Sequence, residues 1–213
     1  AGAPPFAHCL WDFDGTLFDS YPRIAAAVQA VFGEKGAEIS HGEALARSKR
    51  SLNEALSPLG EDAHALKERY RHHARTLDAA LHPVSPYPGM KELLEELARL
   101  GVRHYLYTHR GGSVFPYLEA FGMEGLFADA VTGEDGFALK PDPEAVLALL
   151  ERNGLDPGRA VMIGDRDIDV LAGQNAGTAG CLFDPDGFYK DFQTPLRAGS
   201  VADLRALLLG ERG

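Results

Sequence analysis

The sequence predicts an α/β protein: a parallel sheet with helices on both faces, interrupted after its first strand by an all-helical insertion. Short apolar runs alternate with amphipathic helical patterns in the second part of the chain, which is typical of successive β-α-β units. Between Leu17 and Pro88 the pattern differs, because helical segments follow one another without a convincing strand. We therefore expect a core of residues 1–17 and 85–213 and a helical subdomain of residues 18–84.

Five short apolar runs are predicted to form the strands of the sheet. From the second run onward a helical pattern separates each run from the next, and crossovers of this kind are right-handed and make the strands parallel. The carboxyl ends of the strands should therefore lie at one edge of the sheet. The predicted strands are Ala7–Phe13, Arg103–Tyr107, Ala128–Thr132, Ala160–Ile163 and Thr178–Phe183.

Apolar faces and capping residues predict three helices of the core. Residues 88–100 place apolar side chains on one face and end before a glycine. An Asp-Pro pair, typical of an N-cap with proline at the first helical position, opens a helix over residues 142–153. A capping box with Asp in place of Glu or Gln opens a final helix over residues 200–209.

The insertion is predicted to be helical throughout. Apolar residues recur at helical spacing in its last segment and form one stripe. Its charges balance, so the rest of the chain carries the whole net charge of −10, and this shift in composition also indicates two modules. Prolines near its end indicate a stiff linker that leads the chain back to the core. The predicted helices are Pro22–Glu34, His41–Arg47, Leu52–Ser57 and Asp62–Leu81.

The composition limits the classes of function. The chain has 213 residues, of which 45% are apolar, enough for one large domain or a domain with a smaller insert. The net charge of −10 argues against a nucleic-acid surface, and no apolar run is long enough to predict a transmembrane helix. Cys9 and Cys181 are expected to be buried, reduced thiols of a cytoplasmic protein, and the N-terminus lacks a secretory pattern. The oligomeric state stays open.

Two aspartates, Asp12 and Asp14, follow the first apolar run just before a glycine turn. Side chains two residues apart in an extended chain point to the same side, so both would emerge where ligands bind in open α/β sheets. Two carboxylates about 4 Å apart repel by roughly 4 kcal/mol at an effective dielectric near 20. The pair therefore requires a cation, a shared proton or solvent, unless it is only an acidic turn.

Three later segments place polar side chains at the ends of other predicted strands. Thr108 follows the second strand, Lys140 precedes a helix, and Asp165 and Asp169 lie one helical turn apart and can face one point. Taken singly, Thr108 could be a helix cap, Lys140 a solvated lysine and the acidic pair a complement to a helix dipole. Their joint occurrence with Asp12, in this order along the chain, indicates a single site.

These residues resemble the motifs of the haloacid dehalogenase-like superfamily, and in particular its phosphatases with a helical cap after the first strand, such as phosphoglycolate phosphatases. The resemblance spans nearly the whole chain and implies a Rossmann-like core with residues 18–84 as the cap. Asp12-Phe13-Asp14-Gly15-Thr16 is similar to the first motif, Thr108 to the second, Lys140 to the third, and Gly164-Asp165 with Asp169 to the fourth.

The resemblance implies a role for each motif. Asp12 would attack phosphorus and form an aspartyl-phosphate, and Asp14 would protonate the leaving alcohol and then activate water. Thr108 and Lys140 would bind the phosphoryl oxygens.

The resemblance also implies Mg²⁺ as the cofactor. Its ligands would be Asp12, the backbone carbonyl of Asp14, and Asp165, while Asp169 would hold this shell in place through water. Together with Lys140, such a cation would supply the positive charge that the aspartate pair lacks.

Some residues depart from the family pattern or lie outside it. His109 stands where the family usually has asparagine, and it either contacts phosphate or substrate or stacks in the loop. Backbone N–H groups near Phe13 and His109 would be further donors to phosphate. Arg110 is expected to pack or pair at the rim. Arg50 and two neighbouring cations of the cap either reach an anionic substrate or lie on a solvated surface.

The leading prediction is a magnesium-dependent phosphatase that acts on a small phosphorylated metabolite. Asp14 favours phosphate chemistry over carbon–halogen cleavage, because the dehalogenases of the superfamily lack this aspartate. The alternatives are a sugar phosphomutase similar to β-phosphoglucomutase, a phosphonate-cleaving enzyme that uses a cap lysine such as Lys49, and a non-catalytic binding protein. The sequence does not identify the physiological substrate.

Overall fold

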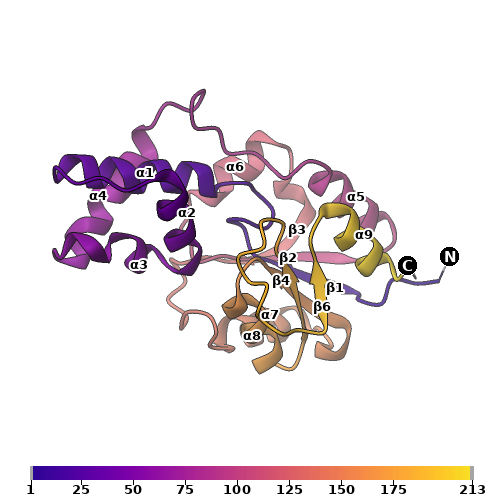
Figure 1. Ribbon diagram of the computed structural model, residues 1–213. Helices are drawn as coiled ribbons and strands as arrows, with labels where there is room; N and C mark the ends of the chain where they lie inside the picture. Colours follow the sequence, from indigo (N-terminus) through magenta and orange to yellow (C-terminus); the bar gives the residue numbers. More distant parts are fainter. Residues whose placement is uncertain (1, 212–213) are drawn as a thin grey trace. The chain divides into compact units, whose positions relative to one another are not determined.

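The computed structural model describes residues 2–211 and divides the chain into two compact units (Figure 1). One unit, the insert, is the segment Asp19–Ser85. The other unit, the core, combines the residues before Asp19 with those from Pro86 onward. Each unit buries its own cluster of apolar side chains.

A fully parallel, six-stranded sheet forms the centre of the core, in the order β3-β2-β1-β4-β5-β6. The α/β fold class predicted from the sequence is confirmed. The chain adds β2 and β3 on one side of β1 and the later strands on the other, so the direction of winding reverses between β1 and β4. The strands are β1 (His8–Trp11), β2 (Arg103–Tyr107), β3 (Phe127–Val131), β4 (Ala160–Gly164), β5 (Ala179–Phe183) and β6 (Leu196–Ala198).

The short edge strand β6 has no counterpart among the predicted strands. Of its three residues only Ala198 is buried, so it lacks the apolar run that marks the other strands. It forms because the edge of β5 presents unpaired backbone groups, with which β6 pairs in parallel.

Helices cover both faces of the sheet, with α5 and α9 on one face and α7 and α8 on the other (Figure 1). Beneath α7 and α8, Leu10, Tyr105 and Met162 belong to one buried cluster, which the alternation of side chains along each strand explains. The helices are α5 (Met90–Arg99), α6 (Val114–Ala120), α7 (Glu144–Asn153), α8 (Asp167–Asn175) and α9 (Val201–Leu209), with the short 3-10 turns η2 (Glu124–Leu126) and η3 (Pro157–Arg159).

Helix α7 begins later than the Asp-Pro pattern predicts. Pro143 precedes the first helical residue, Glu144, instead of being that residue. The Asp142 carboxylate nevertheless accepts a hydrogen bond from the Glu144 N–H at 2.9 Å. The aspartate therefore still satisfies a backbone donor that the start of a helix leaves unpaired.

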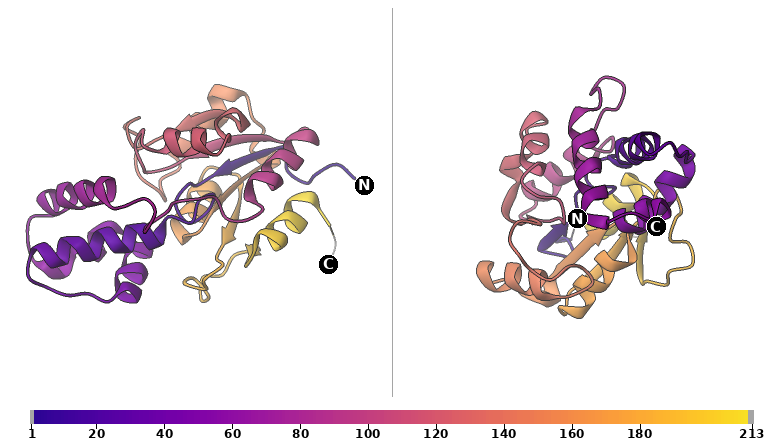
Figure 2. Two further views of the ribbon diagram at one scale, coloured as in Figure 1. Left: turned by 90° about the horizontal axis from the view of Figure 1, so that it is seen from above. Right: turned by 90° about the vertical axis from the view of Figure 1, so that its left-hand side faces the viewer.

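The insert is a small group of packed helices around an apolar cluster (Figure 2). Its second helix is longer than predicted and ends at Arg50 instead of Arg47. The elements are α1 (Tyr21–Glu34), α2 (His41–Arg50), α3 (Leu52–Leu56), η1 (Ser57–Leu59) and α4 (Ala63–Thr76).

Helix α4 ends at Thr76, whereas the apolar stripe predicted a helix to Leu81. The buried Arg23 accounts for the earlier end. Its guanidinium donates hydrogen bonds to the carbonyls of Ala74 and Leu77, and to that of His82 in the loop beyond. These bonds satisfy carbonyls that the end of a helix leaves without partners, so the chain can turn away there.

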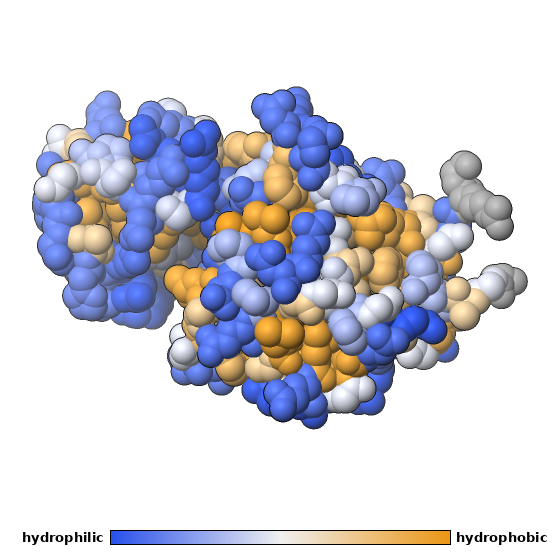
Figure 3. All heavy atoms as spheres, turned by 90° about the horizontal axis from the view of Figure 1, so that it is seen from below, coloured by the Kyte–Doolittle hydropathy of each residue, from blue (hydrophilic) through white to orange (hydrophobic). Residues whose placement is uncertain are grey.

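Most large apolar side chains lie inside the two units. Within residues 2–211 the exceptions include Leu139 and Leu147, and Figure 3 shows apolar patches interrupted by polar side chains. None of the helices in this range is long and apolar enough to cross a bilayer. Cys9 and Cys181 are buried free thiols, as their strand positions predicted.

Candidate active site

The predicted site residues follow strands that are neighbours at the point where the winding of the sheet reverses. Asp12 follows β1, Thr108 follows β2 and Asp165 follows β4. Backbone hydrogen bonds hold the first two in place, from Asp12 N to Ile163 O at 2.9 Å and from Thr108 N to Val131 O at 3.0 Å. Ligands bind at this position in doubly wound sheets.

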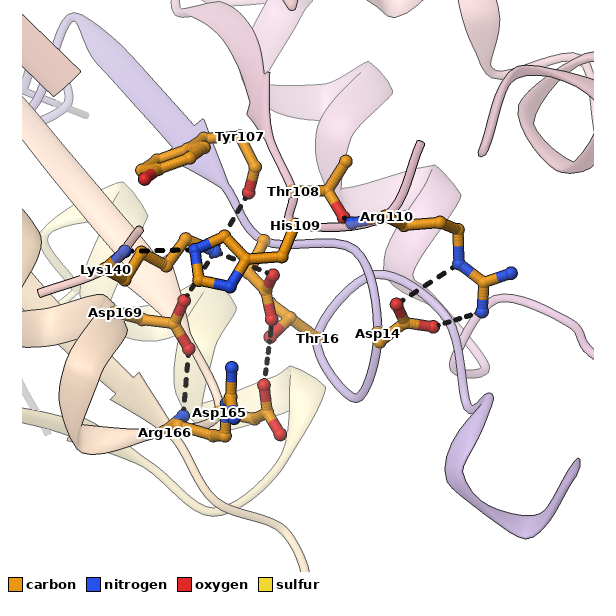
Figure 4. A network of polar contacts seen from close by, with 11 residues as sticks. Asp14, Thr16, Tyr107, Thr108, His109, Arg110, Lys140, Asp165, Arg166 and Asp169 are labelled. Carbon is orange, nitrogen blue, oxygen red and sulfur yellow. Dashed lines mark hydrogen bonds and ion pairs between the residues drawn. The ribbon is translucent and has the colours of Figure 1, made fainter. Parts of the chain in front are cut away.

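Lys140 lies at the centre of a buried polar cluster (Figure 4). Its Nζ is 3.0 Å from Asp12 Oδ1 and 2.8 Å from Asp169 Oδ1, and it donates to the Tyr107 carbonyl oxygen at 3.1 Å. The same Nζ lies 4.4 Å from the centroid of the Tyr107 ring. The ammonium group is therefore fixed between two carboxylates and offsets part of their charge.

Thr16 connects Asp12 with Asp165. Its buried Oγ1 lies 3.3 Å from Asp12 Oδ2 and 3.3 Å from Asp165 Oδ1. Because a hydroxyl carries a single proton, it donates to one of these carboxylates at a time. The sequence assigned Thr16 no role, since its only signal is its place at the end of the first motif.

Asp165, two residues before α8, and Asp169, in the first turn of α8, are fully buried. Asp169 Oδ2 accepts a hydrogen bond from the Arg166 N–H at 3.0 Å, while Oδ1 faces Lys140. Gly164 leaves room for this side chain, because a Cβ built on it would lie 2.2 Å from both Cβ and Cγ of Asp169. The glycine before Asp165 is therefore a packing requirement of the site.

The cluster has an excess of negative charge. Burial raises the pKa of Asp12 to about 7 against the opposing effect of Lys140, and the charges of Asp165 and Asp14 also raise it. Burial and the charge of Asp12 likewise raise the pKa of Asp169. Burial by itself would lower the pKa of Lys140, but the carboxylates of Asp12 and Asp169 outweigh it and hold that pKa above its ordinary value. Lys140 alone does not balance three carboxylates.

These carboxylates fit a divalent cation. Asp12, Asp165 and Asp169 each offer an oxygen, and the three oxygens lie within 4.8 Å of one another. Carboxylate oxygens are the ligands that hard cations such as Mg²⁺ prefer, and a cation there would lower the raised pKa of Asp12. Both oxygens of Asp169 face N–H donors, Lys140 Nζ and the Arg166 backbone N–H, whereas Asp12 Oδ2 and Asp165 Oδ1 face the Thr16 hydroxyl. Asp12 and Asp165 are therefore the candidates for direct ligation.

Asp14 points away from this cluster toward Arg110 (Figure 4). Arg110 Nε donates to Asp14 Oδ2 at 3.2 Å and Nη2 donates to Oδ1 at 2.6 Å. The two aspartates of the first motif therefore have different cationic partners, Lys140 for Asp12 and Arg110 for Asp14. Arg110 therefore adds a positive charge beside those that Lys140 and magnesium were expected to supply.

His109 connects the loop after β2 with the Lys140 segment. Its Nε2 accepts a hydrogen bond from the Lys140 backbone N–H at 3.0 Å, and its ring lies edge-on to Tyr107 at a centroid distance of 6.0 Å. Burial, Lys140 and Arg166 lower the pKa of His109 to about 3, so the ring is neutral. His109 was considered either as a contact to phosphate or substrate or as a residue that stacks in the loop. The contacts that it makes here are with the loop itself.

The remaining predicted residues occupy different environments. Thr108 is buried, and its Oγ1 accepts the N–H of Arg110 at 3.0 Å, which leaves the hydroxyl proton for donation. The Phe13 ring is buried and stacks on Phe18, so only its backbone is available to a ligand. Arg50 belongs to the insert, where it is exposed and lies 3.5 Å from Glu54 Oε1.

Comparison with known proteins gives consistent matches over most of the chain. A family model for haloacid dehalogenase-like hydrolases matches residues 9–182. Phosphoglycolate phosphatase from Pasteurella multocida (strain Pm70) is 31% identical over 186 residues, which cover 79% of this chain and 81% of the relative. A solved structure of a candidate haloacid dehalogenase-like hydrolase from Bacteroides fragilis has a TM-score of 0.81 at 21% identity, covering 93% of this chain and 99% of the other.

A candidate β-phosphoglucomutase from Bacteroides vulgatus also shares the fold, with a TM-score of 0.72 at 23% identity over 94% of this chain and 86% of the other. The chain belongs to the haloacid dehalogenase-like hydrolase family. The prediction of a phosphatase-type hydrolase is confirmed at the level of this class.

Proposed function

We propose that the protein is a magnesium-dependent phosphatase that hydrolyses a small organic phosphate monoester through an aspartyl-phosphate at Asp12. The arrangement of Asp12 supports this most. One carboxylate oxygen faces Lys140 and the other faces Thr16, at the edge of the sheet where the loops converge. These two contacts fix the orientation of the carboxylate, as in-line attack by a nucleophile requires.

The reaction would proceed in two displacements at phosphorus. In the first, an Asp12 oxygen attacks phosphorus, the bond to the leaving oxygen breaks, and Asp14 gives that oxygen its proton. In the second, Asp14 takes a proton from water as the water oxygen attacks the acyl phosphate, which releases inorganic phosphate and the Asp12 carboxylate. Lys140 and Thr108 offer N–H and O–H donors to the phosphoryl oxygens. Magnesium held by Asp12 and Asp165 would add positive charge beside the transferring group.

Replacing Asp12 by asparagine tests the proposal with little change in shape. We expect magnesium-dependent hydrolysis of p-nitrophenyl phosphate to fall by about a thousandfold or more in Asp12→Asn. Asp167→Asn is the matched control, because Asp167 Oδ1 accepts the N–H of Ile168 in its own helix and the Asp12–Lys140–Asp169 contacts do not involve it. Full activity of Asp12→Asn, or full activity in EDTA, would contradict the proposal.

Phosphoglycolate is the first substrate to test, because curated relatives such as the Pasteurella multocida protein are named phosphoglycolate phosphatase. We expect release of inorganic phosphate from phosphoglycolate with a higher kcat/KM than from p-nitrophenyl phosphate. The phosphomutase alternative, to which the likeness with the Bacteroides vulgatus structure lends support only at the level of fold, predicts an isomerised sugar phosphate in place of free phosphate. Product analysis on a panel of phosphorylated metabolites separates the two.

A further inference from the structure

Both oxygens of the Asp14 carboxylate are held by one guanidinium group. Arg110 donates from Nε and Nη2 to Oδ2 and Oδ1 of Asp14, which is the bidentate arrangement of an arginine–carboxylate pair. Such a fork fixes the plane and the direction of a carboxylate, whereas a single contact would fix only a distance. The orientation of Asp14 is therefore set by the Arg110 side chain (Figure 4).

Arg110 is itself held in place by aromatic rings of the core. Its guanidinium carbon lies 5.3 Å from the centroid of the Phe13 ring and 5.5 Å from that of the Tyr117 ring. Phe13 is fully buried and stacks on Phe18 at a centroid distance of 4.5 Å, so this platform belongs to the packed interior. Stacking on these rings removes much of the rotational freedom of the arginine before any substrate binds.

The loop after β2 joins this pair to the Thr108 hydroxyl. The Arg110 N–H donates to Thr108 Oγ1 at 3.0 Å, while the Arg110 side chain holds Asp14. A single loop thus connects the hydroxyl that is proposed to bind the phosphoryl group with the carboxylate that is proposed to protonate the leaving oxygen.

We propose that Arg110 is a positioning residue that orients Asp14 for proton transfer to the leaving oxygen; this inference rests on the proposed function. Asp14 gives the leaving oxygen the proton that it took from water in the second displacement of the preceding turnover. A protonated carboxyl keeps acceptor capacity on its oxygens, so Arg110 can still hold Asp14 in that state. Arg110 acts through Asp14 and not by binding the phosphoryl group, which is the part assigned to Lys140 and Thr108.

The leaving group distinguishes this role from others. A p-nitrophenolate ion leaves readily without a proton, whereas an alkoxide requires general-acid assistance. The ratio kcat/KM reports the steps up to departure of the leaving group and does not include the later hydrolysis that both esters share. Glycerol 2-phosphate is the alkyl probe, because its alcohol carries no charge that Arg110 could bind.

In Arg110→Met we expect kcat/KM for glycerol 2-phosphate to fall roughly ten- to hundredfold, against less than about threefold for p-nitrophenyl phosphate. Arg110→Lys keeps the charge without the fork and should give an intermediate loss for the alkyl ester. In an Asp14→Asn background the further change to Arg110→Met should alter either kcat/KM by less than about twofold, because residues that act as a unit are not additive.

Arg205→Met is the matched control. Arg205 forms a comparable bidentate pair with Glu96, at 2.9 and 2.7 Å, between α9 and α5. Its loss should leave the ratio of the two kcat/KM values unchanged.

Equal losses for both esters in Arg110→Met, or a full additional loss in the Asp14→Asn background, would overturn the positioning role while leaving the phosphatase proposal intact. A wild-type protein that hydrolyses neither ester would instead overturn the phosphatase proposal and the positioning role with it.

Discussion

The two ring nitrogens of His104 have fixed roles inside the core. Nδ1 accepts the indole N–H of Trp11 at 2.9 Å, so Nε2 carries the proton that it donates to the Leu94 carbonyl at 2.9 Å. Burial lowers the pKa of His104 from 6.5 to about 4, although the hydrogen bond to Leu94 opposes this effect. A second proton, on Nδ1, would point at the N–H of Trp11.

The folded protein therefore binds this proton less readily than the unfolded chain does. The contribution of His104 to stability is complete above pH 6.5 and is lost as the pH falls toward 4, because the unfolded state takes up the proton first. With these two pKa values, the free energy of unfolding should decrease by about 2 kcal/mol between pH 7.5 and pH 5 on account of His104.

His104→Gln isolates this contribution. The glutamine amide has an acceptor and a donor for the same two partners but does not titrate in this range. Urea unfolding can be followed through Trp11, the only tryptophan of the chain, at both pH values. The wild type should lose about 2 kcal/mol more than His104→Gln on acidification, and His41→Gln, a change at an exposed residue of the insert, should behave like the wild type. An identical pH dependence of wild type and His104→Gln would refute the reasoning.

Two further substitutions test the packing of the site and of the insert. Gly164→Ala places a Cβ 2.2 Å from Asp169 Cβ. We expect phosphatase activity to fall at least about tenfold and the free energy of unfolding in urea to fall by about 1–3 kcal/mol. Unchanged kinetics would show that activity does not depend on this position of the Asp169 side chain. Arg23→Met leaves carbonyls of Ala74 and His82 without their donor, so it should lower the free energy of unfolding of the insert by about 2–3 kcal/mol by circular dichroism. The control Arg47→Met, which loses an exposed pair with Glu43, should change it by less than about 1 kcal/mol, and equal effects of the two would contradict the capping role of Arg23.

The fold class was predictable because it depends on short-range patterns. Alternating apolar runs and helical segments locate the parallel strands, and parallel strands bring Asp12, Thr108 and Asp165 to one edge whatever the details of packing. The end of the first strand was less accurate. Trp11 is its last residue, whereas the prediction extended to Phe13, because Phe13 continues the buried run after the backbone has left the ladder.

The partners of the site residues could not be predicted from spacing. Arg110 meets Asp14 across 96 positions of sequence, and Thr16 meets Asp165 across 149. These contacts depend on side-chain directions in loops, which carry no periodicity that a sequence could reveal. The end of α4 was missed for the same reason, since Arg23, on a different helix, determines it.

The central claim is that Asp12 becomes phosphorylated, and trapping that species is the most direct test. The enzyme would be mixed with excess phosphate ester and Mg²⁺, quenched in acid within one turnover, and mapped by mass spectrometry. We predict one phosphoryl group on the peptide that contains Asp12, removable by hydroxylamine as an acyl phosphate is, present in Asp167→Asn and absent in Asp12→Asn. Turnover without any such species, or a phosphoryl group on another residue, would contradict the mechanism.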